Sequence, residues 1–156
     1  SDPYVPVDFA QQHGIEVVSL EQLYARSDYI SLHTPVTDQT KGMINAGTIA
    51  KMKDSAVLIN TARGQLVDEP DLCAALESGK LRGAGLDVFE VEPLPADSPL
   101  LQAKHVFLSN HIAGLDCESF RDMFSMAADT IIMLHSGHWP ADRIVNLKGE
   151  TSWRWD

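Results

Sequence analysis

The chain has 156 residues, with 12 Lys and Arg against 22 Asp and Glu, and therefore a formal net charge of −10. This charge argues against binding nucleic acid through a basic surface, and no apolar run approaches the ~18–20 residues that span a bilayer. With 44% hydrophobic residues, two Cys and no secretory signal, the chain is expected to be a cytoplasmic globular protein without a disulfide framework.

The first third of the chain alternates short helices and strands. In chain order the pattern predicts a helix over 7–13, a strand over 15–18, a helix over 20–26, a strand over 29–32 and a helix over 46–53. Gly14 is expected to end the first helix, and Ser19 and Asn45 are predicted N-caps.

The alternation continues to the end of the chain. The pattern predicts a strand over 56–60, a helix over 69–79 with Asp68 as its N-cap, a strand over 84–88, a loop over 89–99, a strand over 106–109 and a helix over 117–136. Crossover connections of this length predict an α/β fold, with a parallel sheet and helices on both faces. Ligands bind such sheets at the carboxyl ends of the strands.

The last predicted helix has one apolar face, which is expected to form core or interface. Its members are Phe120, Met123, Phe124, Ala127, Ile131 and Leu134. Trp139, Trp153 and Trp155 follow it, and gathered aromatic residues often pack on a partner. His135 and His138 have HxxH spacing, but no other ligand motif accompanies them, so no metal site is predicted.

Three side chains suited to acid–base chemistry follow predicted strands. Arg63 can bind a carboxylate through two hydrogen bonds, and a carboxylate such as Glu92 paired with His111 would hold the imidazole in one tautomer. Each residue type also occurs commonly as a solvated or structural group, so the prediction rests on their shared position at strand ends.

Five motifs then occur in order: Ser31-Leu32-His33-Thr34-Pro35, Gly42-Met43-Ile44-Asn45, Asn60 to Asp68 (NTARGQLVD), Gly85 to Pro93 (GLDVFEVEP) and Asn110-His111-Ile112-Ala113-Gly114. Together they resemble the D-isomer-specific 2-hydroxyacid dehydrogenases, the family of D-3-phosphoglycerate, glycerate and hydroxypyruvate enzymes, over residues 1–147. The resemblance implies a Rossmann-like domain that transfers a hydride between NAD and a small 2-hydroxy or 2-oxo acid. A homodimer that binds neither nucleic acid nor membrane is expected.

The resemblance also implies roles for individual residues. Arg63 looks like the Arg that binds the substrate carboxylate, His111 like the general acid/base, and Glu92 like its partner. The residues that match cofactor-binding positions are Asp2, His33, Thr34, Pro35, Thr61, Ala62, Asp87, Ala113 and Gly114. Because Asp2 matches the residue that holds the adenosine ribose, and its charge would repel a 2′-phosphate, NAD is expected over NADP.

The largest departure from the family is that no GxGxxG motif occurs in these 156 residues. In the family that loop holds the cofactor pyrophosphate. The chain is therefore expected to be a partial NAD-binding domain over residues 1–147 with a tail over 148–156, and to lack the first βα unit and the substrate domain. Asn110 also stands where the family usually has Pro.

Two other functions remain open at this point. The C-terminal binding protein corepressors keep the Arg, Glu and His set, so a dinucleotide sensor without catalysis is an alternative. An inactive truncated remnant is another. The formate dehydrogenases of the superfamily have Gln at the position of Glu92, which argues against that branch.

Overall fold

The computed structural model describes residues 1–146 and residue 149. The chain divides into two compact units, residues 1–112 and the residues from Ala113 on, and each is described by itself. The predicted boundary after residue 147 lies at residues outside the described part and stays a prediction.

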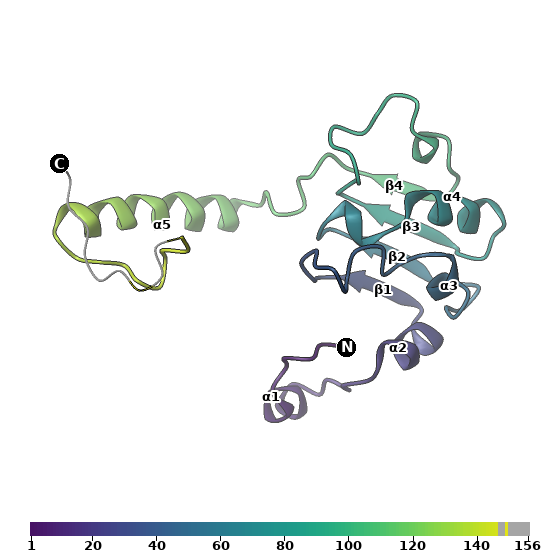
Figure 1. Cartoon of the computed structure of the whole chain (residues 1–156), viewed down its shortest axis with the longest axis horizontal. Coiled ribbons are helices and arrows are strands. Elements are labelled where there is room, and N and C mark those ends of the chain that lie inside the picture. The colour runs from purple at the N-terminus through teal and green to yellow at the C-terminus, as the bar shows by residue number, and fades with distance from the viewer. Residues whose placement is uncertain (147–148, 150–156) are drawn as a thin grey trace. The chain divides into compact units, whose positions relative to one another are not determined.

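The first unit is built on a sheet of four parallel strands, which confirms the predicted α/β class (Figure 1). The strands are β1 (Tyr29–Leu32), β2 (Val57–Asn60), β3 (Gly83–Leu86) and β4 (Val106–Leu108), and they lie in the sheet in this order. Leu32 pairs with Asn60, Asn60 with Leu86 and Leu86 with Leu108. The carboxyl ends of all four strands therefore lie level at one edge of the sheet.

Two short helices precede β1, and the others lie in the connections between strands. They are α1 (Val7–Gln12), α2 (Leu20–Arg26), α3 (Ala46–Ile49) and α4 (Glu69–Glu77), with the 3₁₀ turns η1 (Gly64–Leu66) and η2 (Pro99–Leu101). The predicted caps are confirmed: Ser19 accepts a hydrogen bond from the Gln22 N–H, Asn45 from the Gly47 and Thr48 N–H groups, and Asp68 from the Asp71 N–H.

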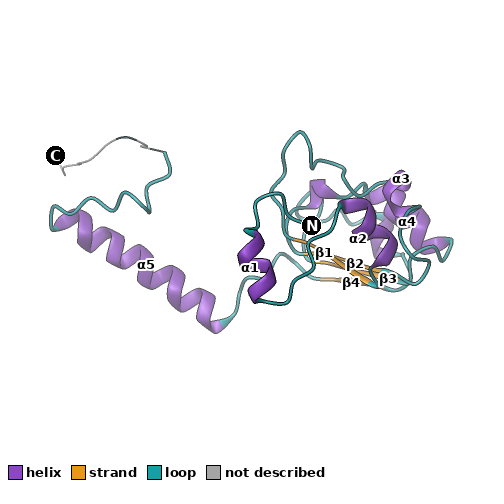
Figure 2. Cartoon of the chain, turned by 90° about the horizontal axis from the view of Figure 1, so that it is seen from below, coloured by secondary structure: helices purple, strands orange, loops and turns teal. Residues whose placement is uncertain are grey.

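The hydrophobic core of this unit lies between the sheet and helices α3 and α4, which lie on the same side of it (Figure 2). Along β1 the buried side chains Ile30 and Leu32 alternate with the exposed Tyr29 and Ser31. Phe107 of β4 is 74% exposed. Helices were expected on both faces, but within residues 1–112 they cover one face, and the second helical layer is absent from this unit.

Two predicted elements differ from the structure. Residues 15–18 form no strand, because no strand lies beside them to accept backbone hydrogen bonds, and Ile15 and Val17 are half exposed. The helix predicted over 46–53 ends at Ile49, since the Lys51 and Met52 N–H groups bond three residues back, in turn geometry.

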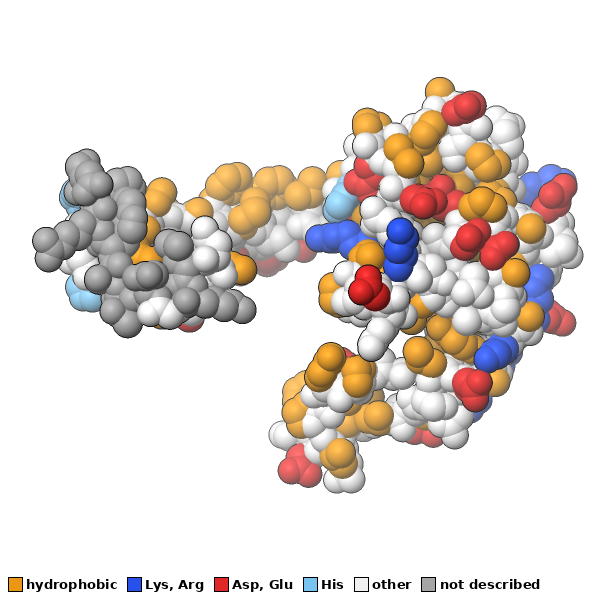
Figure 3. All heavy atoms as spheres, in the orientation of Figure 1, with side chains coloured by type: hydrophobic (Ala, Val, Ile, Leu, Met, Phe, Trp, Pro, Cys, Tyr) orange, Lys and Arg blue, Asp and Glu red, His pale blue; other side chains and the backbone are white. Residues whose placement is uncertain are grey.

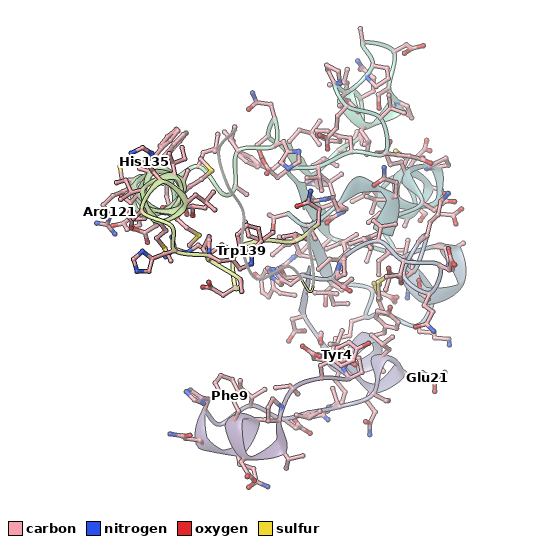
Figure 4. The ribbon with its side chains drawn as sticks, turned by 60° about the vertical axis from the view of Figure 1, so that its left-hand side comes forward. Tyr4, Phe9, Glu21, Arg121, His135 and Trp139 are labelled. Atoms are coloured by element: carbon pink, nitrogen blue, oxygen red, sulfur yellow. The ribbon has the colours of Figure 1, made fainter. Side chains whose placement is uncertain are left out.

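The second unit contains the 19-residue helix α5 (Cys117–His135), which the structure bounds close to the prediction. Its apolar face was predicted to form core or interface. None of its residues is buried, and Phe124 and Ile132 are each 62% exposed, so within the described residues this face is not part of a core. Figure 4 shows side chains around its whole circumference, with Arg121 and His135 labelled. Among the described residues, no helix is long and apolar enough to cross a membrane. Trp153 and Trp155 lie outside the described residues.

One glycine lets two loops at the carboxyl edge of the sheet meet backbone to backbone. A Cβ on Gly64 would lie 1.8 Å from the carbonyl carbon of Phe89 and 2.3 Å from the nitrogen of Glu90. No real Cβ contact is this short, so only Gly fits here. The loop after β2 and the loop after β3 therefore depend on this residue for their spacing.

Replacing Gly64 by Ala should lower the free energy of unfolding by about 3 kcal/mol or more, because backbone must shift to accept the methyl group. The measurement is urea unfolding followed by circular dichroism. Gly85→Ala is the matched control: its Cβ would meet nothing within 4 Å, and the change should stay below about 1 kcal/mol. Equal losses in the two variants would contradict the close-approach explanation.

Candidate active site

A cavity of about 970 Å³ opens at the carboxyl edge of the sheet. It brings together five of the residues predicted to touch ligand, since His33, Thr34 and Pro35 follow β1, and Ala62 and Arg63 follow β2. The level ends of β1 and β2 explain this meeting. Val36, Lys41 and Gln65 complete the lining. A cavity of this volume is in the range that small-molecule ligands occupy.

Asn60 shapes the loop that carries Arg63. This last residue of β2 is 1% exposed, its side-chain amide donates to the Arg63 carbonyl at 2.9 Å, and its oxygen accepts from the Ala62 N–H at 3.1 Å. The guanidinium of Arg63 donates to the Ala62 carbonyl at 2.6 Å, and its side chain remains exposed. The buried amide thus holds the loop from which Arg63 lines the cavity.

Asp87 shapes the turn that carries His111. Its carboxylate, 3% exposed, accepts hydrogen bonds from the Ser109 hydroxyl at 2.6 Å and the Ile112 N–H at 2.9 Å. Its carbonyl accepts from the His111 N–H at 2.8 Å. His111 has a φ of 60°, in the left-handed region that costs a non-glycine residue about 1–2 kcal/mol. Hydrogen bonds on both sides of His111 offset this cost.

His111 and Glu92 form the predicted pair. The Nδ1 atom of His111 lies 2.8 Å from Oε2 of Glu92. Since an ionised carboxylate only accepts, the ring N–H donates, and the tautomer is defined by this bond. The opposite nitrogen, Nε2, is then the one through which the ring can exchange a proton with a ligand.

Glu92 is held from two sides. Its second oxygen accepts the Phe89 N–H at 3.0 Å, and the adjoining Glu90 N–H bonds to Glu69 of α4 at 2.7 Å. The hydrogen bond from His111 lowers the pKa of Glu92, the Phe89 N–H lowers it further, and the charge of Arg63 adds to this effect. The three predicted catalytic residues lie in the segments that follow β2, β3 and β4, at one edge of the sheet.

The other predicted cofactor residues are placed differently. Thr61 is exposed next to the cavity but does not line it, and Asp2 bonds to the Tyr4 N–H at 2.7 Å. Ala113 and Gly114 belong to the second unit. Their contacts with cofactor stay predictions, as does that of Asp87, whose described bonds lie within the protein.

Sequence reasoning missed several residues of the site. Asn60 and Ser109 support the site through hydrogen bonds. Asn60 is the last residue of β2 and Ser109 directly follows β4, and these positions were the signal in the sequence that could have identified them. Lys41 and Gln65 enter the cavity because the Gly42 N–H bonds to the Gln65 carbonyl at 2.8 Å. No sequence pattern predicts that contact. In the described part of the chain, no group of three or more His, Cys, Asp or Glu side chains could hold a metal ion.

Comparison with known proteins places the chain in a family. Residues 1–113 match the D-isomer specific 2-hydroxyacid dehydrogenase, NAD binding domain, and the chain belongs to this family. The match covers the first unit, including Arg63, Glu92 and His111, and it confirms the resemblance read from the motifs.

Individual relatives agree with this assignment. The chain is 42% identical to a glyoxylate reductase of Korarchaeum cryptofilum over 88% of its own length and 41% of that enzyme. It is 45% identical to glyoxylate/hydroxypyruvate reductase B of Yersinia pestis over 81% of its length and 39% of that protein. An NAD-complexed D-isomer specific 2-hydroxyacid dehydrogenase from Lactobacillus delbrueckii superposes with a TM-score of 0.81 at 29% identity, over 90% of this chain and 46% of the other. The chain thus spans less than half the length of these relatives.

Removing the Asp87 carboxylate should loosen the His111 turn. Asp87→Ala leaves the Ser109 hydroxyl and the Ile112 N–H without their acceptor, and should cost about 2 kcal/mol or more of unfolding free energy. Asp87→Asn, which keeps a side-chain oxygen, should cost less. In nitrogen-15 spectra of the imidazole, Asp87→Ala should lose the signature of a Nδ1–H hydrogen bond. A variant with wild-type stability and an unchanged spectrum would contradict this role of Asp87.

The stability that Glu92 contributes through its hydrogen bond with His111 should decrease in acid. Because the folded-state pKa of Glu92 is lowered from 4.5, its contribution to stability is present above about pH 4.5 and is lost as the pH falls through the lower folded value. The carbon-13 titration midpoint of the Glu92 carboxyl should move up toward 4.5 in His111→Gln. In the control His33→Gln, whose ring bonds to Ser31 instead, it should not move. An unmoved midpoint in His111→Gln would contradict the pairing.

Proposed function

We propose that this chain supplies the cofactor-binding and acid–base half of an NAD-dependent oxidoreductase that interconverts D-2-hydroxy acids and 2-oxo acids. The observation that carries the proposal is the His111–Glu92 hydrogen bond of 2.8 Å, which lies at the same edge of the sheet as the loop of Arg63. Membership of the dehydrogenase family and the glyoxylate and hydroxypyruvate reductases among the relatives support it.

Each residue of the set has one role. Arg63 binds the carboxylate of the acid through paired N–H groups, which orients the neighbouring oxo carbon. His111, with Nδ1 bonded to Glu92, gives a proton from Nε2 to the oxo oxygen during reduction and takes it back from the hydroxyl during oxidation. Glu92 stabilises the protonated ring as its counter-ion.

The cofactor fits the cavity in charge and lining. His33, Thr34, Pro35 and Ala62 would lie along it, and the lining carries no carboxylate that would repel its phosphates. When bound, the nicotinamide supplies the hydride. Asp2 would hold the ribose hydroxyls and favour NADH over NADPH.

The protein is further proposed to be cytoplasmic and to form a homodimer. The dimer is supported by the exposed apolar side chains of α5, among them Phe124, Ile131 and Ile132. Exposed apolar surface of this kind is typical of association sites.

The proposal is tested by calorimetric titration of the chain with NADH and NADPH, then of the NADH-saturated chain with oxalate, an unreactive analogue of a 2-oxo acid. NADH should bind at least about tenfold more tightly than NADPH, with the difference reduced in Asp2→Asn, because the ribose carboxylate repels a 2′-phosphate. Oxalate binding should be lost in Arg63→Gln. Lys104→Gln, which removes an exposed cation outside the cavity, is the charge control.

Turnover gives the second measurement, as oxidation of NADH by glyoxylate followed by absorbance. The rate of NADH oxidation above the uncatalysed background should fall by ~10²–10⁴-fold in His111→Gln. A rate unchanged in that variant would remove the acid–base role. NADH binding without any oxalate binding would instead favour a dinucleotide sensor, and absence of NADH binding would overturn the proposed cofactor site.

A further inference from the structure

The cavity has a charge opposite to that of the chain as a whole. The chain carries a net charge of −10, yet the lining includes two cations, Lys41 and Arg63, and no carboxylate. Figure 3 shows two Lys or Arg side chains close together, with a His side chain on one side of them and an Asp or Glu side chain on the other. A local cluster of cations against an acidic background focuses the binding of anions at that point.

The backbone keeps Lys41 beside the Arg63 loop. The Lys41 N–H closes a turn to the Thr37 carbonyl at 2.9 Å, and the next residue, Gly42, has a φ of 62°. Gly42 then bonds to the Gln65 carbonyl, and the Ile44 N–H bonds to the Leu66 carbonyl at 3.0 Å. Residues 42–44 thus run alongside the loop after β2, so the position of Lys41 relative to Arg63 is determined by backbone hydrogen bonds.

The ammonium group of Lys41 is not used in the ion pairs of the described residues. Lys51, Lys53 and Lys80 each contact a carboxylate, at 3.1, 2.9 and 2.6 Å. Lys41 and Lys104 form no such pair in the same part of the chain, and of these two only Lys41 lines the cavity. Its charge is therefore open to a ligand in the cavity.

We infer that Lys41 is a binding residue for a second anionic group, a phosphate or carboxylate, on a ligand in the cavity that Arg63 also lines. A Lys ammonium binds such groups as a point charge, while Arg63 supplies the planar, two-point contact for the oxo acid carboxylate. This inference rests on the proposed function. The second anion has two possible sources: the cofactor phosphates, or a second acidic group on the oxo acid.

The experiment compares Lys41→Gln with wild type by calorimetry, using two kinds of ligand. The first is NADH. The second is a matched pair of five-carbon acids, 2-oxopentanoate and 2-oxoglutarate, which differ only in the terminal carboxylate and are titrated into the NAD⁺-saturated chain, where no hydride is available to reduce them. Lys104→Gln is the control for loss of one exposed positive charge, and Lys41→Arg should restore most of the affinity.

If the cofactor is the source, Lys41→Gln should weaken NADH about five- to tenfold, and raised salt should reduce the difference. If the oxo acid is the source, NADH affinity should be unchanged, and a preference for 2-oxoglutarate over 2-oxopentanoate should be lost. Either result supports the inference.

The inference is overturned if Lys41→Gln matches wild type within twofold for every ligand, if Lys104→Gln has an equal effect, or if the wild-type chain binds none of these anions. Absence of NADH binding by the wild-type chain would overturn the proposed cofactor site as well. Where NADH binds, failure of the proposed function is distinct, because it is read from Arg63→Gln and His111→Gln. Loss of oxalate binding in Arg63→Gln alongside a neutral Lys41→Gln would leave the proposed function in place and remove only the role of Lys41.

Discussion

The site depends on a contact that has no side chain in it. Gly64 lies so close to the backbone of Phe89 and Glu90 that a single added carbon would overlap it. Arg63 precedes this glycine, and Glu92 follows the segment it touches. The spacing between the Arg63 and Glu92 segments thus follows from two backbones in contact. A contact between backbones varies less in length than one between flexible side chains.

Around that contact, polar groups at the strand ends hold the loops. Asn60 at the end of β2 binds the Arg63 loop, and Asp87 just after β3 binds the His111 turn. Both are almost fully buried and are satisfied by backbone groups, so neither loop can move without leaving a buried polar atom unpaired. This rigidity lets His111 keep its left-handed backbone conformation and its bond to Glu92.

Sequence reasoning succeeded where local rules act. The helix caps at Ser19, Asn45 and Asp68 depend on residues no more than three positions away. Apolar segments such as 56–60 are typical of strands in a buried parallel sheet. It failed at residues 15–18, where an apolar pattern has no neighbouring strand. On α5 it left core and interface open, and only the structure shows that the amphipathic face has no cover within the described chain. In both cases the pattern is local but the burial requires a partner.

By itself, the sequence determined the class of fold and the positions of most elements, and its motifs singled out Arg63, Glu92 and His111 as the predicted chemical set. Helix caps, side-chain periodicity and motif order are properties of neighbouring residues, so they can be read along the chain. Only the tertiary structure decided that Gly64 separates two loops, that Asp87 supports the His111 turn, and that Lys41 lines the cavity with Arg63. These three contacts depend on the register of the strands and on hydrogen bonds between segments that are distant in the sequence. Such contacts are defined only once the chain has folded, so they cannot be read from neighbouring residues.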